Sequence, residues 1–420
     1  MPRSLLIVVL ALLTAFGPMS IDMYLPGLPV IATDLRADYG GAELTLSTFF
    51  LGFACSQVIY GPLADRLGRR RPLLAGIAIY ILGSIGCALA HDITMLIACR
   101  FFQAAGCSAG PMLARTIVRD LYTGARVARV LSIMMTVMGC APMLAPIIGG
   151  QILVHADWRA IFWLGAGFAA VMFLIILVWL PETLPPERRL AGHGFGNGIG
   201  AMAGSYAIML RHPLFLSYAL GGSLVFGGVL AYLAGSPQVF ITLHHVTPQT
   251  YALLFALNIV GLIGVSALNA WVVARFGVER MLGIGIAAAA AAGVALVGVS
   301  FSRIDSVALL VPPLFCFVAS LGMVGANGIA GCLNIFPERA GAASALFGCL
   351  QMTSGAILGA LVGWAADGTA RPMAVFVCAG GVLALAAQRG LAYISRRQHR
   401  RDGHAALRGV EYPTRISGSE

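Results

Sequence analysis

The sequence has 420 residues, of which 59% are hydrophobic and only 10% are charged, with a mean hydropathy of +0.88. Soluble domains carry about 25% charged residues, and a membrane-spanning helix needs about 20 apolar residues, so this composition leaves no room for a soluble catalytic domain. The net charge is +10 and all 27 basic residues are arginine. Because these arginines flank apolar stretches, they indicate membrane orientation and not a nucleic-acid partner.

Twelve apolar stretches follow one another and predict an all-α membrane protein with twelve transmembrane helices. The first stretch could pass for a signal peptide, but its apolar run continues to Ala32, and the internal repeat described below requires this helix. The predicted helices are 5–32, 44–64, 72–91, 93–117, 128–153, 159–180, 213–236, 250–274, 281–301, 306–332, 340–364 and 371–394.

The segments between these helices alternate between arginine-rich and arginine-poor. With the N-terminus inside the cell, the cytoplasmic segments hold 21 arginines and the periplasmic loops hold four. A bilayer favours basic residues on its cytoplasmic side. We therefore predict a multi-pass protein of the bacterial inner (cytoplasmic) membrane with both termini in the cytoplasm.

The two halves of the chain repeat each other. Tyr24–Pro29 ends the first predicted helix and Tyr232–Pro237 ends the seventh, with four identities at an offset of 208, and Arg66–Gly68 matches Arg275–Gly277 at an offset of 209. These matches predict two pseudo-symmetric six-helix bundles, a plan known from transporters that bind substrate between the halves. The predicted domains are an N-terminal bundle (1–180), a central cytoplasmic loop (181–212), a C-terminal bundle (213–394) and a basic cytoplasmic tail (395–420).

Asp22 is the only acid deep within a predicted helix of the first half, and the second half has none in its predicted helices. It lies about 5 Å beyond the middle of the first apolar run at 1.5 Å per residue. A charged residue at such a depth costs about 2.5–3.5 kcal/mol on insertion scales and is usually functional. A carboxylate balanced between burial and nearby positive charge can exchange protons near neutral pH. The alternative is an acid that caps a helix or meets water near the periplasmic side.

The segment between predicted helices 2 and 3 combines a tight turn with one acid and four arginines. Asp65 can pair with an arginine or cap the N-terminus of a neighbouring helix, which would hold the cytoplasmic face closed until the halves rock. Membrane anchoring would explain the arginines but not the glycines or Asp65 at fixed spacing. The residues of this predicted gate are Gly61, Asp65, Arg66, Gly68, Arg69 and Arg70.

Predicted helix 5 contains Pro142, Pro146, Gly149 and Gly150. Proline removes an intrahelical hydrogen bond and kinks a helix, and glycine allows close approach to a partner helix from the other half. This combination favours a hinge that seals the path against proton leak over ordinary helix packing.

Several of these stretches resemble one family. The segment Gly61–Arg70, with the sequence GPLADRLGRR, is similar to the loop 2–3 motif of the major facilitator superfamily, and Arg100–Gly106 resembles its helix-4 RxxQG motif, with Ala104 in the position of that glycine. Ala141–Gly150 resembles the helix-5 antiporter motif of the twelve-helix drug:proton antiporters, although Ala145 replaces its first glycine. The resemblance is strong over helices 1 to 6 and continues loosely into helix 11.

Three further stretches are similar to the Bcr/CflA branch: Ser20–Pro26, Asp157–Phe162 and Leu180–Leu184. That branch exports bicyclomycin, chloramphenicol-type and other drugs. The resemblance implies the major facilitator fold, supports Asp22 as the proton-coupling acid, and makes Arg100 part of the proton relay. The alternative for Arg100 is that it extends to the periplasmic headgroups.

Methionine, aromatic and amide side chains suit adaptable binding of unlike small molecules. The predicted substrate cavity consists of such residues facing the centre, namely Met19, Tyr24, Gln103, Met138, Phe226, Tyr232, Asn258, Asn327 and Gln351.

The sequence therefore predicts a proton-driven exporter of drug-like molecules, and the alternative is a proton-coupled porter of a sugar or another small metabolite on the same scaffold. An enzyme is not predicted, because the sequence has no P-loop, no HExxH and no nucleophile–base grouping. The nine cysteines and eight histidines show no metal-ligand spacing. We expect no cofactor beyond the coupling protons, and a monomer in the lipid bilayer.

Overall fold

The computed structural model describes residues 3–122, 125–184, 204–302 and 306–408. Within these ranges, twelve helical segments are long and apolar enough to cross a membrane, which confirms the predicted fold class. The first half contains α1 (Arg3–Asp22), η1 (Leu25–Gly27), α2 (Leu28–Asp34), α3 (Tyr39–Leu67), α4 (Arg70–Ala88), α5 (Ile93–Cys107), α6 (Ala109–Leu121), α7 (Ala125–His155) and α8 (Arg159–Trp179). The second half contains α10 (Pro213–Pro237), η3 (Gln238–Leu243), α11 (Pro248–Phe276), α12 (Val278–Phe301), α13 (Val307–Ile335), η4 (Pro337–Arg339), α14 (Ala340–Trp364) and α15 (Arg371–Arg408).

Three of the spans consist of more than one helical segment. The first span contains α1, η1 and α2, the fourth contains α5 and α6, and the seventh contains α10 and η3. Pro26 and Pro29 account for the break in the first span, because proline donates no backbone hydrogen bond and restricts the residue before it. The prediction of continuous first and fourth helices was therefore wrong at Asp22–Leu25 and at Ser108.

The repeat seen in the sequence has a counterpart in the backbone. The turn after α3 contains Gly68 with φ +86°, and the turn after α11 contains Gly277 with φ +80°. Glycine adopts this region without the steric cost that a Cβ would impose. Both halves thus connect their second and third spans through the same kind of turn at an offset of 209.

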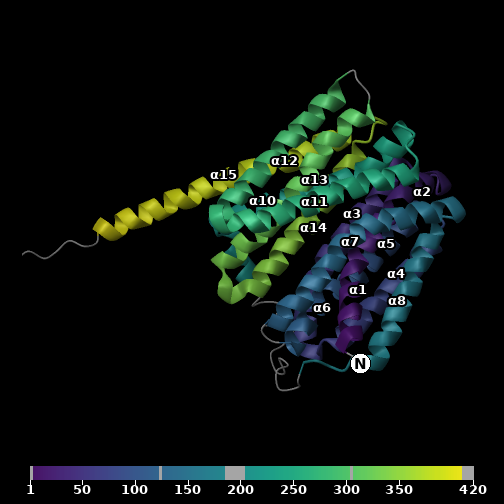
Figure 1. Ribbon diagram of the computed structural model, residues 1–420, viewed down its shortest axis with the longest axis horizontal. Coiled ribbons are helices and arrows are strands. Elements are labelled where there is room, and N and C mark those ends of the chain that lie inside the picture. The colour runs from purple at the N-terminus through teal and green to yellow at the C-terminus, as the bar shows by residue number, and fades with distance from the viewer. Residues whose placement is uncertain (1–2, 123–124, 185–203, 303–305, 409–420) are drawn as a thin grey trace, which may run out of the picture.

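The two six-helix bundles meet through two pairs of helices. α3 packs against α14, and α7 packs against α11. These are spans 2 with 11 and 5 with 8, so exchanging the halves converts one pair into the other. Figure 1 shows the first half at lower right and the second at upper left, in contact near α2.

The contacts between the halves are closest at the end of the molecule that contains α2, the start of α3, η3 and the start of α11, which we call the arginine-poor end. There the Tyr39 hydroxyl of α3 donates to the Ala234 carbonyl of α10 at 3.3 Å and accepts from the Gln238 backbone N–H at 2.8 Å. Gly150 of α7 faces the Pro248 carbonyl of α11. At the opposite, arginine-rich end, the N-terminus of α1 and the far end of α15 point apart (Figure 1).

The predicted domain boundaries fall partly outside the described residues. Of the central loop 181–212, residues 185–203 are outside, and of the tail 395–420, residues 409–420 are outside. α15 continues as one helix to Arg408, beyond the predicted helix end at residue 394.

Candidate functional site

Asp22 is the last residue of α1 and lies where the first span breaks. It is buried, with 4% of its surface exposed. Its carboxyl interacts electrostatically with Tyr232 of α10 and Tyr251 of α11, both in the second half. The acid therefore lies between the two bundles, where a relative movement of the halves changes its surroundings.

The two tyrosines that face Asp22 are themselves held by neighbouring side chains. The Tyr232 hydroxyl accepts a hydrogen bond from the Asn258 amide at 2.9 Å, and the Tyr251 hydroxyl lies 2.9 Å from the Ser236 hydroxyl. Phe255 stacks on the Tyr232 ring with centroids 6.2 Å apart. This polar cluster gives Asp22 a fixed neighbourhood in the second half.

Arg100 of α5 is completely buried in the first half, so the alternative of a side chain at the headgroups was wrong. Its Nη1 donates to the Ser20 carbonyl at 3.1 Å and to Gln103 Oε1 at 2.7 Å. Its guanidinium lies over the rings of Phe49 and Tyr24, with centroid distances of 4.3 and 4.6 Å. Such contacts with aromatic faces stabilise a cation away from water.

No ion pair joins Arg100 and Asp22 among the described residues. The guanidinium instead reaches the carbonyl of Ser20, two positions before the acid. Nε and Nη2 of Arg100 have no hydrogen-bond partner in the described part of the chain. Arg100 thus touches the helical turn that ends in Asp22 and keeps two donors available.

The helix-5 motif lies against the broken first span. α7 continues through Pro142 and Pro146 as one α-helix. A Cβ built on Gly149 would overlap the backbone carbonyl of Met23, the residue after Asp22, whereas Gly150 faces the other half. The predicted close approach to the other half therefore applies to Gly150, and Gly149 instead allows α7 to contact the break beside the acid.

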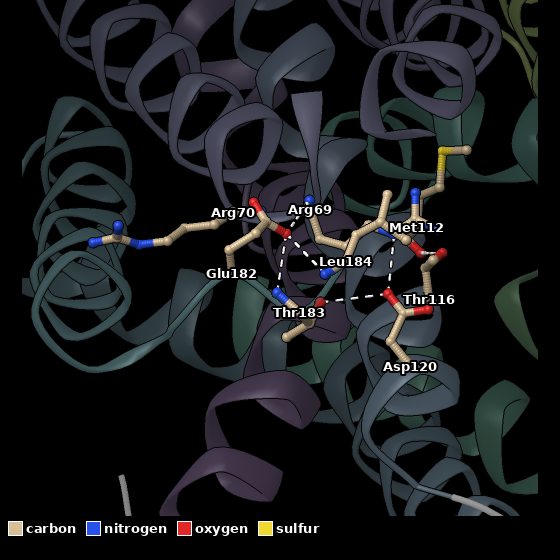
Figure 2. A network of polar contacts seen from close by, with 8 residues as sticks. All are labelled: Arg69, Arg70, Met112, Thr116, Asp120, Glu182, Thr183 and Leu184. Carbon is tan, nitrogen blue, oxygen red and sulfur yellow. Dashed lines mark hydrogen bonds and ion pairs between the residues drawn. The ribbon is translucent and has the colours of Figure 1, made fainter. Parts of the chain in front are cut away.

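A second polar network lies at the arginine-rich end, where α4 begins (Figure 2). The Glu182 carboxylate accepts the backbone N–H groups of Arg69 at 2.8 Å, Arg70 at 3.3 Å, Thr183 at 3.0 Å and Leu184 at 3.1 Å. A carboxylate at a helix N-terminus is stabilised by the unpaired N–H groups and by the helix dipole. Glu182 is therefore the acid that caps α4.

The pKa of Glu182 reflects these contacts. Burial raises it, but the backbone N–H groups of Arg69, Leu184, Arg70 and Thr183 together outweigh burial and hold the pKa below its ordinary value. Gly68 makes this arrangement possible, because a Cβ at that position would overlap the Glu182 carboxylate.

Arg69 extends the network to α6. Its Nε lies 3.0 Å from Asp120 Oδ2, and the Thr183 hydroxyl donates to the same oxygen at 3.4 Å (Figure 2). Asp120 of α6 thus pairs with Arg69 and not with its sequence neighbour Arg119 among the ion pairs of the described residues. The network joins α4, α6 and the segment after α8 within the first half.

The other residues of the predicted gate lie around this network. Gly61 and Arg66 lie in the last turns of α3, and Arg70 donates to the Leu177 carbonyl of α8. The side chain of Asp65 lies outside the part of the chain whose contacts are described, so its predicted role as a latch stays a prediction.

The predicted cavity residues fall into two groups. One group is half-buried or exposed, and consists of Met19, Phe226, Gln351 and Met138. The other is buried and hydrogen-bonded to protein, and consists of Tyr24, Gln103, Tyr232, Asn258 and Asn327. In the second group, Tyr24 binds Thr45 at 2.8 Å and Asn327 binds Asn269 at 2.7 Å. These side chains act first as connections between neighbouring spans.

Glu43 of α3 is a second acid within a span of the first half, so the expectation that Asp22 stands alone there was wrong. It is fully buried, and neither carboxylate oxygen has a hydrogen-bond partner among the described residues. The predicted second helix began at residue 44, so Glu43 lay one position outside it. Asp38 caps α3 by accepting the Gly41 N–H at 3.1 Å, and this N-cap residue is the signal that would have moved the start of the helix.

Comparison with known proteins supports the same architecture. The family model described as Major Facilitator Superfamily matches residues 10–360. An uncharacterized MFS-type transporter, YdgK of Bacillus subtilis (strain 168), is 35% identical over 395 residues, which cover 93% of this chain and 96% of that protein. A bicyclomycin resistance protein homolog of Haemophilus influenzae is 30% identical over 371 residues, covering 87% and 91%.

The fold also matches a solved structure. A crystal structure of the peptide transporter POT in complex with sulfate superimposes with a TM-score of 0.72 at 17% identity, covering 93% of this chain and 94% of that one. An identity this low speaks for the fold alone. Together with the family match, which covers most of the twelve spans, it makes the chain a member of the major facilitator superfamily, a family of membrane transporters and not of enzymes.

Proposed function

We propose that this transporter exports drug-like small molecules in exchange for protons, with Asp22 as the coupling acid. The observation that carries the proposal is the position of Asp22. It is buried at the break in the first span, faces Tyr232 and Tyr251 of the other half, and has no ion-pair partner among the described residues. A group so placed gains or loses a proton when the halves tilt and its access to water changes.

The alternation of arginine supports an orientation with the arginine-rich end in the cytoplasm. The end at which the halves are in contact through Tyr39 and Gly150 then faces the periplasm. In the proposed cycle, Asp22 takes up a proton from the periplasm, and the transporter releases its substrate there. Asp22 then loses the proton on the cytoplasmic side, so that substrate can bind again. The transporter works as a monomer in the inner membrane and needs no cofactor besides protons.

The proposed substrate class rests on two observations. One relative is named a bicyclomycin resistance protein homolog, and Gly149 of the helix-5 motif lies directly against the break beside Asp22. Half-buried Met19 and Phe226 offer apolar surface of the kind that accommodates amphipathic molecules of different shapes. A sugar or another metabolite in place of a drug is the competing outcome of the test below.

Inverted membrane vesicles test the proposal directly. With an acidic lumen, the wild type should accumulate a drug such as bicyclomycin or chloramphenicol, and adding the drug should dissipate the gradient. Asp22→Asn should abolish both effects while leaving the protein folded, since the amide has similar size but cannot titrate. Accumulation by Asp22→Asn at the wild-type rate would remove Asp22 from the coupling, and proton movement driven by sugars but by none of a drug panel would favour the metabolite porter.

A further inference from the structure

Glu43 lies on the surface of α3 that closes the molecule at the arginine-poor end. It shares one face of this helix with Tyr39 and Ser47, at spacings of four residues. Tyr39 bonds the second half through Ala234 and Gln238. A Cβ on Gly363 of α14 would meet Glu43 Oε2 at 2.6 Å, so the carboxyl lies against the α14 backbone.

The packing of α3 against α14 buries Glu43 completely. A Cβ on Gly40 would meet the Gly363 carbonyl oxygen at 2.5 Å, and Gly359 faces the Ser47 hydroxyl at 3.1 Å. Ser47 is also buried and without a hydrogen-bond partner among the described residues. Two glycines on α14 and one on α3 thus bring the helices together directly over the carboxyl.

No described charged group of the neighbouring elements compensates a negative charge at this position. α14 has no acidic or basic residue between Ala340 and Trp364. On α5, Arg100 lies over Phe49, and on α2, Asp34 is bound by Trp158 and Arg159. Thr45 binds Tyr24, whose ring lies beside Arg100. At 100° per residue, Thr45 is about 200° around α3 from Glu43, so Arg100 lies on the opposite side of this helix.

The described titratable group that interacts with Glu43 is the phenol of Tyr39. Tyr39 interacts electrostatically with Glu43, and also with Tyr251 and Tyr24. Tyr251 in turn faces Asp22. None of these groups supplies a positive charge, and a buried carboxylate without a cation or hydrogen-bond donors is strongly disfavoured relative to the neutral acid. Closure of the two halves over Glu43 therefore requires a proton on its carboxyl.

We propose that Glu43 is a second proton-binding residue, and that protonation of its carboxyl is the condition for closing the arginine-poor end. When the halves separate there, water reaches the carboxyl and the ionised form becomes stable. Low pH on that side protonates the Glu43 carboxyl again and allows α3 and α14 to close. This inference rests on the proposed alternation of access, and it adds a gate that senses pH independently of Asp22.

The distance between the halves at this end tests the proposal. Thr33 in the last turn of α2 and Thr242 in η3 are both exposed and belong to different halves. Spin labels at cysteines in these two positions, in a background without the nine native cysteines and reconstituted in lipid nanodiscs, report opening by pulsed electron resonance. With Glu43 present, the short-distance population should grow as the pH falls. With Glu43→Gln it should dominate over a wider pH range than in the wild type, because the amide is neutral and only the pH dependence of Asp22 remains.

Three further variants make the result decisive. Ser47→Ala, which alters the next buried polar group on the same face, should keep the pH response. Glu43→Asp should keep it with a shifted midpoint, which also shows that the site tolerates substitution. Asp22→Asn should keep a pH response at this end as well, because the contribution of Glu43 remains when residue 22 cannot titrate.

A wild-type pH response in Glu43→Gln, or a response lost in Asp22→Asn and kept in Glu43→Gln, would overturn the proposal. Since the measurement needs no substrate and no proton gradient, its outcome is separate from whether the protein exchanges drugs for protons.

Discussion

Arg100 shows how a single buried cation is placed by its shape. Its guanidinium donates to the Ser20 carbonyl and to Gln103 while lying flat over Phe49 and Tyr24. Both bonds come from Nη1, and a compact lysine ammonium cannot donate to these two oxygens while also lying flat over both rings. We expect Arg100→Lys to lower the free energy of unfolding by about 1–3 kcal/mol, since a buried charged hydrogen bond is lost.

Thermal unfolding in detergent measures this loss. Arg115→Lys is the matched control, because Arg115 makes its described hydrogen bond to the Pro111 carbonyl alone, which a lysine can also reach. The expected order is a clear decrease for Arg100→Lys and a small one for Arg115→Lys. Equal stability of the two variants would contradict the importance given to the flat guanidinium of Arg100 between the rings and its two acceptors.

Glu182 leads to a pH-dependent prediction. Its folded-state pKa is depressed, because the four backbone N–H groups outweigh burial. A group with a depressed pKa contributes stability above its unfolded pKa and loses that contribution as the pH falls through the folded value. Glu182→Gln should therefore lower the free energy of unfolding by about 1–2 kcal/mol at neutral pH, where hydrogen bonds to the ionised carboxylate are strongest.

The difference between Glu182→Gln and wild type should shrink as the pH falls below the ordinary range of glutamate, since the wild-type carboxyl then becomes neutral as well. Unfolding midpoints of both proteins at several pH values measure this. Glu338 of η4 is exposed at the same end of the second half, and Glu338→Gln should show no comparable pH-dependent difference. A Glu182→Gln difference that stays constant with pH would show that the carboxylate charge is irrelevant.

At this scale, the sequence revealed the residues whose chemistry contrasts with their surroundings. Asp22 was predictable because it is an acid within an apolar run. Glu43 was missed because it lies in the first turns of α3, and its burial depends on Gly363, which is 320 positions later. The capping role of Glu182 was likewise invisible, because it requires the segment after α8 to meet the start of α4.

Two glycines of helix α7 differ in their surroundings, and alanine substitutions can measure the effect of this difference on stability. Gly149 contacts the Met23 backbone, which cannot move aside as a flexible side chain could. Gly139, on the same helix, has no atom within 4 Å of a built Cβ. We expect Gly149→Ala to destabilise the protein by about 1–3 kcal/mol through overpacking, whereas Gly139→Ala should be neutral or slightly stabilising, because alanine is the better helix former.

The proposed drug efflux should follow the same order, since Gly149→Ala displaces the break that contains Asp22. Resistance of expressing cells, together with the amount of folded protein in the membrane, separates a loss of activity from a loss of protein. Two alanine variants that behave alike would show that the contact between α7 and Met23 has no special importance.

The existence of the elements was more predictable than their interruptions. Hydrophobicity over about 20 residues is enough to place a spanning helix, and all twelve spans were found in this way. The break at Asp22–Leu25 depends on Pro26 and Pro29 and on the contact of Gly149 with the Met23 backbone. Hydrophobicity alone shows only one long apolar run there. Pro111 lies three positions after Ser108, and Pro237 directly precedes η3. The predicted seventh helix ended beside Pro237, whereas the prediction of a continuous fourth helix did not use Pro111.

For the whole molecule, the internal repeat predicted two halves, and the positive φ of Gly68 and Gly277 agrees with it. The state of the molecule did not follow from the sequence, because the same repeat is compatible with closure at either end. Closure at the arginine-poor end depends on contacts between residues about 200 positions apart, such as those of Tyr39 with Ala234 and Gln238. Such pairs are produced by the packing of α3 against the other half.

Tyr39 therefore provides the prediction for the whole molecule. Its hydroxyl satisfies the Gln238 N–H and the Ala234 carbonyl across the interface, and Phe would leave both without this partner. The Gln238 N–H keeps its bond to the Gly235 carbonyl, so the loss is that of the two tyrosine hydrogen bonds, about 0.5–1.5 kcal/mol each. Every 1.4 kcal/mol changes an equilibrium about tenfold. Tyr39→Phe should thus shift the molecule toward separation at the arginine-poor end by about tenfold or more.

The spin-label distance between positions 33 and 242 measures this shift at fixed pH. Tyr393→Phe, at an exposed position on α15, is the matched control and should leave the distance distribution unchanged. Because Glu43 is intact in Tyr39→Phe, low pH should still favour the short distance. At each pH, however, the population with the short distance should be smaller than in the wild type. A distribution identical to wild type would mean that apolar packing of α3 against α14, and not the tyrosine bridge, holds this end closed.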